Sequence, residues 1–406
     1  MGSDAMTNDR PGPERPGLFA LLASWWGEHA AAQLALLAGT ALLFGLLGGN
    51  MVENMHRFGI TPGFDFLDRP ANFEIGESLI AYSARDSYGH AILVGLLNTV
   101  KVAVAGCVLA TVLGVALGVA RLSGNPLLSG IVQAYVELIR NTPLLLQLFF
   151  WSATLHALPP PRQALHPFAG VYLCNRGILM PALADGTDVG WLAAALAASA
   201  ALVAGFLRAM RRLGRRRGRP MAGGACLAAR LVVAALALAL PAVALLAGPP
   251  LAVEVPELRG FNFVGGATLS PEFAALLVGL VVNASAGVSE IVRSGIQSVS
   301  AGQWEAARAL GLPWGRTMRL VILPQALRVI VPLMTSTYLS LTKNSSLAVA
   351  IGFPDLVSVV NTSANQTGQA LEAMAILMVT YLALSLAVSV AMNAYNRRMA
   401  LRGMSR

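Results

Sequence analysis

Eight apolar stretches, each close to the length of a membrane-crossing helix, constrain this chain more than any other feature. A helix needs about 20 mostly apolar residues to cross the hydrocarbon core of a bilayer. The composition agrees, because 56% of the residues are hydrophobic and only 12% are charged. We therefore expect an all-α, polytopic membrane protein with about eight transmembrane helices. The expected spans are residues 30–50, 91–120, 141–158, 189–207, 231–248, 273–292, 329–351 and 373–396.

The basic residues between these spans predict the orientation of the chain. Of the 29 Lys and Arg residues, 21 lie in segments on the same side as the N-terminus and 6 on the other side. Because cytoplasmic segments are enriched in Lys and Arg, we expect both termini in the cytoplasm and the first span retained as a helix. The segments 51–89 and 159–161 then lie outside, where their turn residues predict irregular caps.

Several kinds of chemistry are missing from the sequence. It contains no G-x-x-x-x-G-K-[ST] loop for nucleotide phosphates and no H-E-x-x-H metal motif. Cys107, Cys174 and Cys226 lie too far apart for a zinc spacing or a disulfide framework. We expect no catalytic residue, no metal and no cofactor in this chain, so energy for any transport must come from a partner or a gradient. The basic segments favour a lipid membrane over nucleic acid as the partner.

The segment 298–325 between the sixth and seventh spans carries the most local information. Its Ser300 and Gln303 have the spacing of a capping box, in which each side chain bonds the backbone of the other, so a helix should begin there. Gly311 is suited to the left-handed conformation that ends a helix, and Pro313 prevents the helix from continuing. A short helix ending in a bend is therefore predicted.

A second short helix is predicted to follow the bend. Pro313 suits a first helical turn because it needs no amide partner there. Pro324 disfavours helical geometry in the residue before it, so this helix should end just before Pro324. Two short helices meeting at a bend are expected on the cytoplasmic face.

At this point the segment resembles a known family. Glu305-Ala306-Ala307 followed by Gly311 and then Leu323-Pro324 is similar to the EAA signature of permease subunits of ABC importers, with Val321 where that family commonly has Ile. The stretches 135–147 and 341–347 are similar to the polar amino acid branch. The resemblance covers about residues 90–155 and 270–398. The layout resembles the large permease of the general L-amino acid and glutamate/glutamine/aspartate/asparagine importers of Gram-negative bacteria.

The resemblance implies a type I ABC importer permease core in the bacterial inner membrane. It divides the chain into an N-terminal part (1–89), a first core part (90–158), an insertion with two extra spans (159–270) and a second core part (271–406). It implies four partners beyond this chain: a second homologous permease, a cytoplasmic ATPase dimer that binds ATP-Mg, a periplasmic amino-acid-binding protein and the lipid membrane. The function implied is uptake of L-amino acids; the alternative is a gradient-driven secondary transporter.

The resemblance also assigns the bend as a coupling helix that receives the motion of the ATPase. Small residues permit close approach and a tryptophan offers a buried anchor, a role that Trp314 could share. The alternative is an ordinary helical hairpin on the membrane surface. The candidate coupling residues are Trp304, Glu305, Ala306, Ala307 and Gly311.

The seventh span is unusually polar for contact with lipid, which indicates a wet passage. Lys343 offers a partner for a carboxylate and Asn344 offers amide contacts. The alternative is that the hydroxyls bond their own helix and that Lys343 extends towards solvent. Lys101 either lies near the outer end of its span or faces the bundle. The candidate passage residues are Asn98, Thr99, Asn283, Thr337, Ser340, Lys343, Asn344 and Ser345.

Two charge pairs recur in similar contexts near the cytoplasmic boundary. Glu137 with Arg140, and Glu290 with Arg293, stand three residues apart and so share one helix face. We interpret both as structural ion pairs, with gating as the alternative.

Overall fold

The computed structural model describes residues 30–57, 63–184, 190–217 and 253–404, together with positions 232, 233, 235 and 243. Within these residues, five helices are long and apolar enough to cross a membrane, and two shorter apolar helices accompany them. They correspond to seven of the eight predicted spans. The predicted fifth span, 231–248, lies outside the described residues apart from the four single positions. The long helices are Ala31–Asn54, Tyr88–Arg121, Pro271–Gln297, Trp314–Ile351 and Ala370–Arg397, and the short ones are Leu144–His156 and Ala194–Met210.

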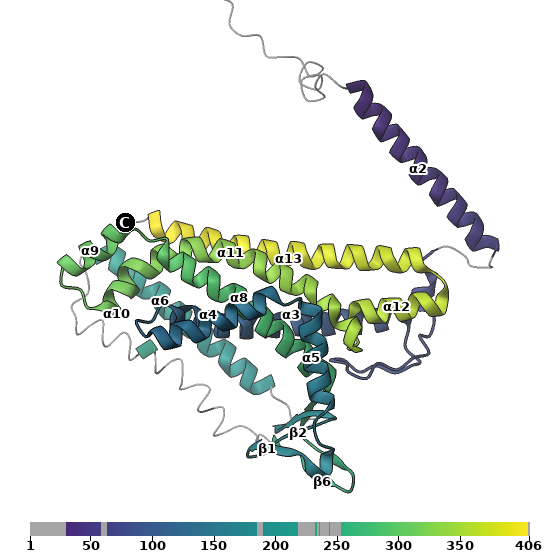
Figure 1. The fold of residues 1–406 in the computed structure, drawn as a ribbon, viewed down its shortest axis with the longest axis horizontal. Coiled ribbons are helices and arrows are strands. Elements are labelled where there is room, and N and C mark those ends of the chain that lie inside the picture. Colours follow the sequence, from purple (N-terminus) through teal and green to yellow (C-terminus); the bar gives the residue numbers. More distant parts are fainter. Residues whose placement is uncertain are drawn as a thin grey trace, which may run out of the picture.

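Four helices run lengthwise through the bundle in Figure 1. They are α3 (Tyr88–Arg121), α8 (Pro271–Gln297), α11 (Leu323–Asn344) and α13 (Ala370–Met404). The helix α2 (Ala30–Arg57) extends away from them, and its described side chains are mostly exposed.

Glycines let α3 and α8 pack closely. A Cβ atom on Gly114 would lie 2.5 Å from a carbon of Val288, and one on Gly118 would lie 2.8 Å from a carbon of Val292. Small residues at helix contacts are the usual way for membrane helices to approach one another. These contacts hold the C-terminal half of α8 against the C-terminal half of α3.

The predicted third span, 141–158, forms one shorter helix, and a separate helix precedes it. The chain forms α4 (Pro126–Asn141), becomes extended at Thr142 and continues as α5 (Leu144–His156). Pro143 has no N–H to donate, which explains why α4 ends just before it and α5 begins just after it. In Figure 1, α4 runs along the bundle while α5 turns away towards a group of strands.

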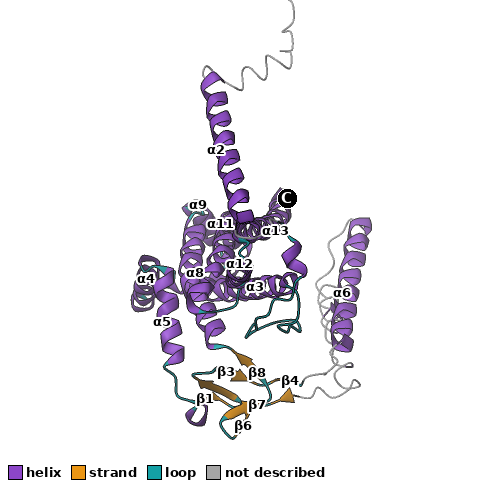
Figure 2. Ribbon diagram, turned by 90° about the vertical axis from the view of Figure 1, so that its right-hand side faces the viewer, coloured by secondary structure: helices purple, strands orange, loops and turns teal. Residues whose placement is uncertain are grey.

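The prolines at 159–161 lie in irregular chain and at the start of a 3-10 turn, as predicted, but strands that the sequence did not predict follow from Leu165 on. A four-stranded antiparallel sheet has the order β1-β2-β3-β8, and the strand pairs β4·β5 and β6·β7 lie beside it (Figure 2). The strands are too short for their alternation to be detected in the sequence. The 3-10 turn η2 (Pro161–Gln163) precedes them. Their bounds are β1 Leu165–Phe168, β2 Val171–Cys174, β3 Gly177–Met180, β4 Ala182–Leu183, β5 Val253–Glu254, β6 Glu257–Arg259, β7 Asn262–Val264 and β8 Ala267–Leu269.

These strands join the two sides of the insertion. The chain leaves β4 towards α6 (Gly190–Arg217) and returns in β5, which pairs with β4. The pairing of β3 with β8 likewise joins the end of the first core part to the start of α8. The described strands of the insertion thus connect to the core beside the end of α5 and the start of α8.

The two ends of the bundle differ. One end, here called the bend end, carries α9 (Ala301–Ala309), α10 (Trp314–Thr317) and the π-helical turn η3 (Met318–Ile322). The opposite end carries α12 (Leu356–Thr367), the 3-10 helix η4 (Ser345–Ile351) and residues 63–87, here called the strap, which include the short turn η1 (Asp65–Asp68).

Candidate coupling bend and polar cavity

The bend has the predicted start and turn but lacks the predicted capping box. Ser300 is the residue before α9, yet its side chain makes no capping hydrogen bond. Gln303 instead accepts a 3.3 Å hydrogen bond from Gln325, through its side-chain oxygen. Gly311 has the predicted left-handed backbone, with φ of +66°, and its N–H donates to the carbonyl of Arg308 at 2.9 Å.

The helix after the bend does not end before Pro324, which corrects the second prediction. The helical path continues from α10 through η3 into α11, with Pro324 in the first turn of α11. A π-helical turn changes the hydrogen-bonding register, and this register change lets the chain pass a proline without ending the helix. The bend is thus joined directly to a membrane-length helix.

The candidate coupling residues divide into buried and exposed groups. Ala307 is buried, and Trp304 is half-buried against the neighbouring core. Glu305 and Ala306 are exposed. Trp304 therefore anchors the bend to its own chain. At the tip, Leu310 is 79% exposed and Trp314 is 68% exposed, which leaves an apolar surface open.

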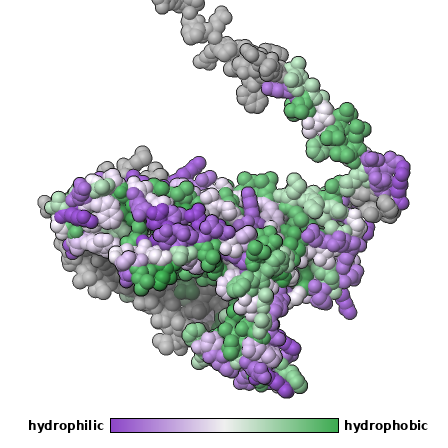
Figure 3. All heavy atoms as spheres, in the orientation of Figure 1, coloured by the Kyte–Doolittle hydropathy of each residue, from purple (hydrophilic) through white to green (hydrophobic). Residues whose placement is uncertain are grey.

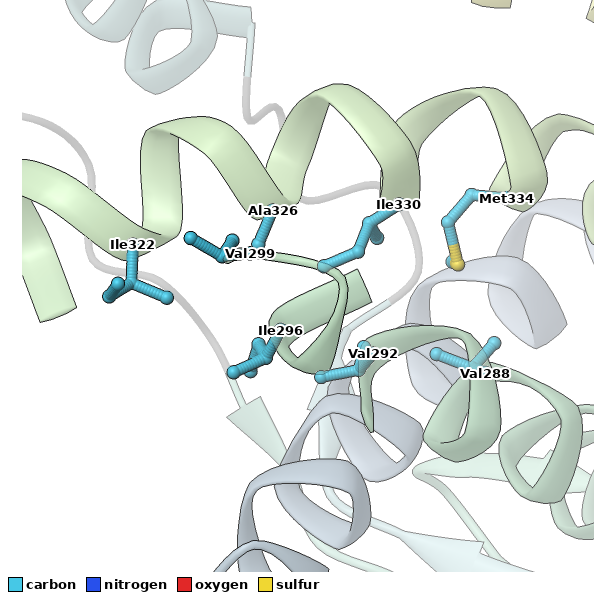
Figure 4. Close-up of a cluster of buried hydrophobic side chains, with 8 residues drawn as sticks. All are labelled: Val288, Val292, Ile296, Val299, Ile322, Ala326, Ile330 and Met334. Carbon is cyan, nitrogen blue, oxygen red and sulfur yellow. The ribbon is translucent and has the colours of Figure 1, made fainter. Parts of the chain in front are cut away.

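A buried apolar cluster connects the bend to two long helices. Figure 4 shows side chains from α8 facing side chains from η3 and α11, with Val299 between them. Its packing is tight, because a Cβ on Gly295 would lie 2.3 Å from Ile330. Displacement of the bend would be passed to α8 and α11, since closely packed interiors transmit strain. The cluster consists of Val288, Val292, Ile296, Val299, Ile322, Ala326, Ile330 and Met334.

The same two helices line a polar cavity of about 280 Å³. Figure 3 shows hydrophilic side chains gathered over α8 and α11 in the middle of this face, beside hydrophobic surface. The polar side chains that line the cavity are Arg140, Asn283, Ser336, Thr337, Ser340 and Asn344.

Several of the polar groups in the cavity are free to meet a ligand. Within the described residues, the side chains of Thr337, Ser340 and Asn344 have no hydrogen-bond partner, whereas the hydroxyl of Ser336 donates to the carbonyl of Leu333 at 2.8 Å. The amide of Asn283 lies 3.5 Å from the side-chain oxygen of Gln147.

Gln147 is a residue that the sequence did not single out. It is 6% exposed, and its amide donates to the carbonyls of Ile139 and Thr142 at 3.0 Å each. The carbonyl of Ile139 also accepts the N–H of Thr142 at 3.3 Å, so Gln147 adds side-chain bonds across the break between α4 and α5 and places its own oxygen 3.5 Å from the amide of Asn283. The Thr-Pro pair in the sequence is the signal that such a partner is needed.

Two of the predicted passage residues on α11 and η4 do not line this cavity. Lys343 lines a separate cavity of about 400 Å³ together with Ser346, Tyr381 and Ser385. Ser345 is buried, and its hydroxyl donates to the carbonyl of Thr342 at 2.7 Å. Lys343 and Ser345 are the chain neighbours of Asn344, but neither lines the polar cavity.

Asn98 and Thr99 are also buried away from the polar cavity. The amide of Asn98 donates to the carbonyls of Glu77 and Pro354 at 2.8 and 2.9 Å. The hydroxyl of Thr99 accepts the N–H of Leu356 at 3.0 Å. Both side chains thus fix the strap and α12 against α3.

Lys101 reaches the strap and faces the bundle. Its ammonium pairs with the carboxylate of Glu77 and lies 4.2 Å from the centre of the Phe273 ring. The second carboxylate oxygen of Glu77 accepts the hydroxyl of Ser270 at 2.6 Å. Glu77 therefore links the strap to the neighbouring ends of α3 and α8.

Aromatic packing holds the rest of the strap in place. Phe66 and Phe73 pack against Tyr88 at the start of α3, and Tyr82 packs against Phe73. Burial, together with the charges of Asp86 and Glu74, raises the pKa of Tyr82 above its usual value. Its hydroxyl stays a donor and bonds the carbonyl of Phe73 at 2.9 Å.

One of the two predicted charge pairs forms. Glu290 pairs with Arg293 as predicted, and its carboxylate also pairs with Arg121 of α3. The prediction of an ion pair between Glu137 and Arg140 is wrong. Glu137 accepts a 2.7 Å hydrogen bond from Gln133, and no ion pair of Arg140 occurs within the described residues. The two side chains line a second cavity of about 390 Å³, which also contacts Arg121 and Glu290.

Comparison with known proteins identifies the family. Residues 228–401 match the family described as "Binding-protein-dependent transport system inner membrane component". The general L-amino acid transport system permease protein AapQ of Rhizobium johnstonii is 44% identical over 354 residues, which cover 87% of this chain and 87% of AapQ. The chain belongs to the permease subunits of ABC transporters.

Two further permeases are similar over nearly the whole chain. The permease protein YhdX of Escherichia coli is 47% identical and is aligned over 91% of this chain and 93% of its own length. The glutamate/glutamine/aspartate/asparagine transport system permease protein BztB of Rhodobacter capsulatus is 39% identical, with coverage of 91% and 92%. This permease is thus an integral membrane transport subunit, and the gradient-driven alternative is not favoured.

Proposed function

We propose that this permease takes up L-amino acids across the bacterial inner membrane, with the bend end and both termini in the cytoplasm. Its relatives AapQ and BztB carry the names of amino acid transport systems. The proposed complex contains this chain, a second homologous permease, an ATPase dimer that binds ATP-Mg and a periplasmic amino-acid-binding protein. In this proposal the chain itself has neither an ATPase site nor a cofactor.

One structural observation carries the mechanism. The exposed tip of the bend is connected through the buried cluster of Figure 4 to α8 and α11, and these two helices line the polar cavity. Work done on the tip by a partner would therefore move the walls of the cavity. Leu310 and Trp314 are the proposed contact with the ATPase because both are exposed at the tip.

The polar cavity is the proposed place of passage. Thr337, Ser340 and Asn344 supply hydroxyl and amide groups along one face of α11, and Asn283 supplies an amide from α8. A zwitterionic amino acid needs both donors and acceptors, and these side chains provide both. Asn98, Thr99, Lys343 and Ser345 are left out of this passage because the polar cavity does not include them.

A substitution at Gly311 tests the coupling. The change Gly311→Pro removes the N–H that bonds Arg308 and forces φ from +66° to a negative value, so the tip of the bend must change its shape. We expect uptake of amino acid by the reconstituted complex to fall at least tenfold while ATP hydrolysis continues. Uptake and hydrolysis are measured in the same proteoliposomes.

The matched control is Gly302→Ala in α9, where a new Cβ meets nothing within 4 Å. This variant should keep both activities. Full uptake by Gly311→Pro, or an equal loss of uptake in the two variants, would contradict the proposed role of the bend.

A further inference from the structure

The polar cavity carries a single formal charge. Its lining consists of Arg140, neutral amides and hydroxyls, and apolar or small residues. Arg140 also lines the second cavity, so the two cavities share this residue. A ligand in the polar cavity would thus meet one positive charge and no negative charge from the described residues.

The neighbouring carboxylates do not neutralise Arg140. Glu290 is engaged by Arg121 and Arg293, and Glu137 is engaged by Gln133. Within the described part of the chain, Arg140 therefore has no ion-pair partner. Arg140 is exposed in the last turn of α4, so its guanidinium is open to a ligand in the cavity that it lines.

The other polar groups that line the cavity complement Arg140. A guanidinium binds a carboxylate through two parallel hydrogen bonds, which is the strongest geometry that a side chain offers to this group. Asn283, Ser340 and Asn344 provide oxygen acceptors for an ammonium group and do not add charge. The volume of about 280 Å³ lies near the lower end of the range for small-molecule sites, about 300 to 1,000 Å³.

We propose that Arg140 binds a carboxylate of the passing amino acid and so makes the cavity favour acidic and neutral amino acids over cationic ones. The inference rests on the proposed function and deepens it. A cationic side chain would enter a cavity that already holds one positive charge and would find no carboxylate there. The selection by Arg140 acts in the membrane subunit and is separate from any selection by the external binding protein.

Lys343, the sequence-predicted carboxylate partner, provides a matched control. Like Arg140 it has no ion-pair partner within the described residues, but it lines the separate cavity beside Tyr381. Glu137→Gln provides a second control. If Arg140 acted only through a pair with Glu137, this variant would have the same effect on binding as an Arg140 variant.

The test measures binding by the intact permease complex in nanodiscs without the binding protein. The probes are radiolabelled L-glutamine, L-glutamate and L-arginine at equilibrium. The wild-type complex should bind glutamine and glutamate more tightly than arginine. Arg140→Gln should weaken binding of glutamine and glutamate about tenfold or more and narrow their advantage over arginine, because charge-assisted hydrogen bonds are lost.

Further variants keep the proposal open to contradiction. Arg140→Lys should preserve the order of the three probes, and Lys343→Gln and Glu137→Gln should bind them as the wild type does. If Arg140→Gln does not assemble, Asn344→Asp places a carboxylate in the same cavity and should shift the preference towards arginine. The proposal would be overturned by unchanged binding in Arg140→Gln or Asn344→Asp, or by a loss in Lys343→Gln equal to that in Arg140→Gln. It would also be overturned if the wild-type complex preferred arginine or bound none of the probes.

ATP-driven uptake by the wild-type complex is measured separately, with glutamine and its binding protein. No uptake in that assay would count against the proposed function itself. If the wild-type complex takes up glutamine but Arg140→Gln binds the three amino acids with the wild-type preference, only the role of Arg140 is overturned.

Discussion

Glu290 shows how a single residue can order the inner part of the bundle. Its carboxylate pairs with Arg293 on its own helix and with Arg121 on α3, and its side chain is 26% exposed. The sequence indicated the pair within one helix because three-residue spacing is local. It could not indicate Arg121, which lies 169 positions away in the chain. For the same reason the sequence did not reveal that Arg140 has no ion-pair partner among the residues that the structure describes.

The change Glu290→Gln should lower the free energy of unfolding of the purified complex by about 1–3 kcal/mol, since two arginines lose a charged acceptor. Thermal unfolding measures this loss. Glu53→Gln is the control, because its pair with Arg57 is exposed and exposed pairs contribute little. Equal stability of Glu290→Gln and the wild type would contradict a structural role for the three-residue charge cluster.

At the level of helices and strands, long apolar runs were predictable and local interruptions were not. The runs at 91–120, 273–292 and 373–396 lie within α3, α8 and α13. Pro324 was expected to end a helix, but the π-helical turn before it absorbs the missing hydrogen bond. The strands of two to four residues around the insertion depend on pairing between distant segments, as in β3 with β8. The pattern of apolar and polar residues within such a short strand does not indicate which distant strand it pairs with.

The contact between α3 and α8 should tolerate no added side chain at its glycines. Gly118→Leu would place a Cβ within 2.8 Å of Val292 and within 2.9 Å of the carbonyl oxygen of Ser289. We expect a loss of about 1–3 kcal/mol or more in unfolding free energy from overpacking, seen as a lower melting temperature and poorer assembly. Val112→Leu is the control on the same helix, since Val112 is 66% exposed. A Gly118→Leu complex as stable as this control would show that α3 and α8 are not packed as described.

Across the whole molecule, the bend and the strap occupy opposite ends of the long helices (Figure 1). The proposal assigns these ends to opposite sides of the membrane. At the bend end an exposed tip is joined through a packed cluster to the cavity walls. At the other end Glu77 ties the strap to α3 and α8. Motion delivered at the bend would then act on α8 while the strap holds its far end, and the change would fall on the cavity that α8 lines with α11.

Cross-linking from the tip of the bend tests this arrangement most directly. A cysteine is placed at Leu310, which is 79% exposed, in a chain whose Cys107, Cys174 and Cys226 are replaced, and the assembled complex is treated with a short bifunctional reagent. The control cysteine replaces Phe261, which is 72% exposed beside the strands β6 and β7. We predict that Leu310→Cys is cross-linked to a nucleotide-hydrolysing subunit and is labelled only by reagents that reach the cytoplasm, while Phe261→Cys is labelled from outside. A Leu310→Cys chain that is labelled from outside, or that cross-links to no ATPase in an actively transporting complex, would contradict the account.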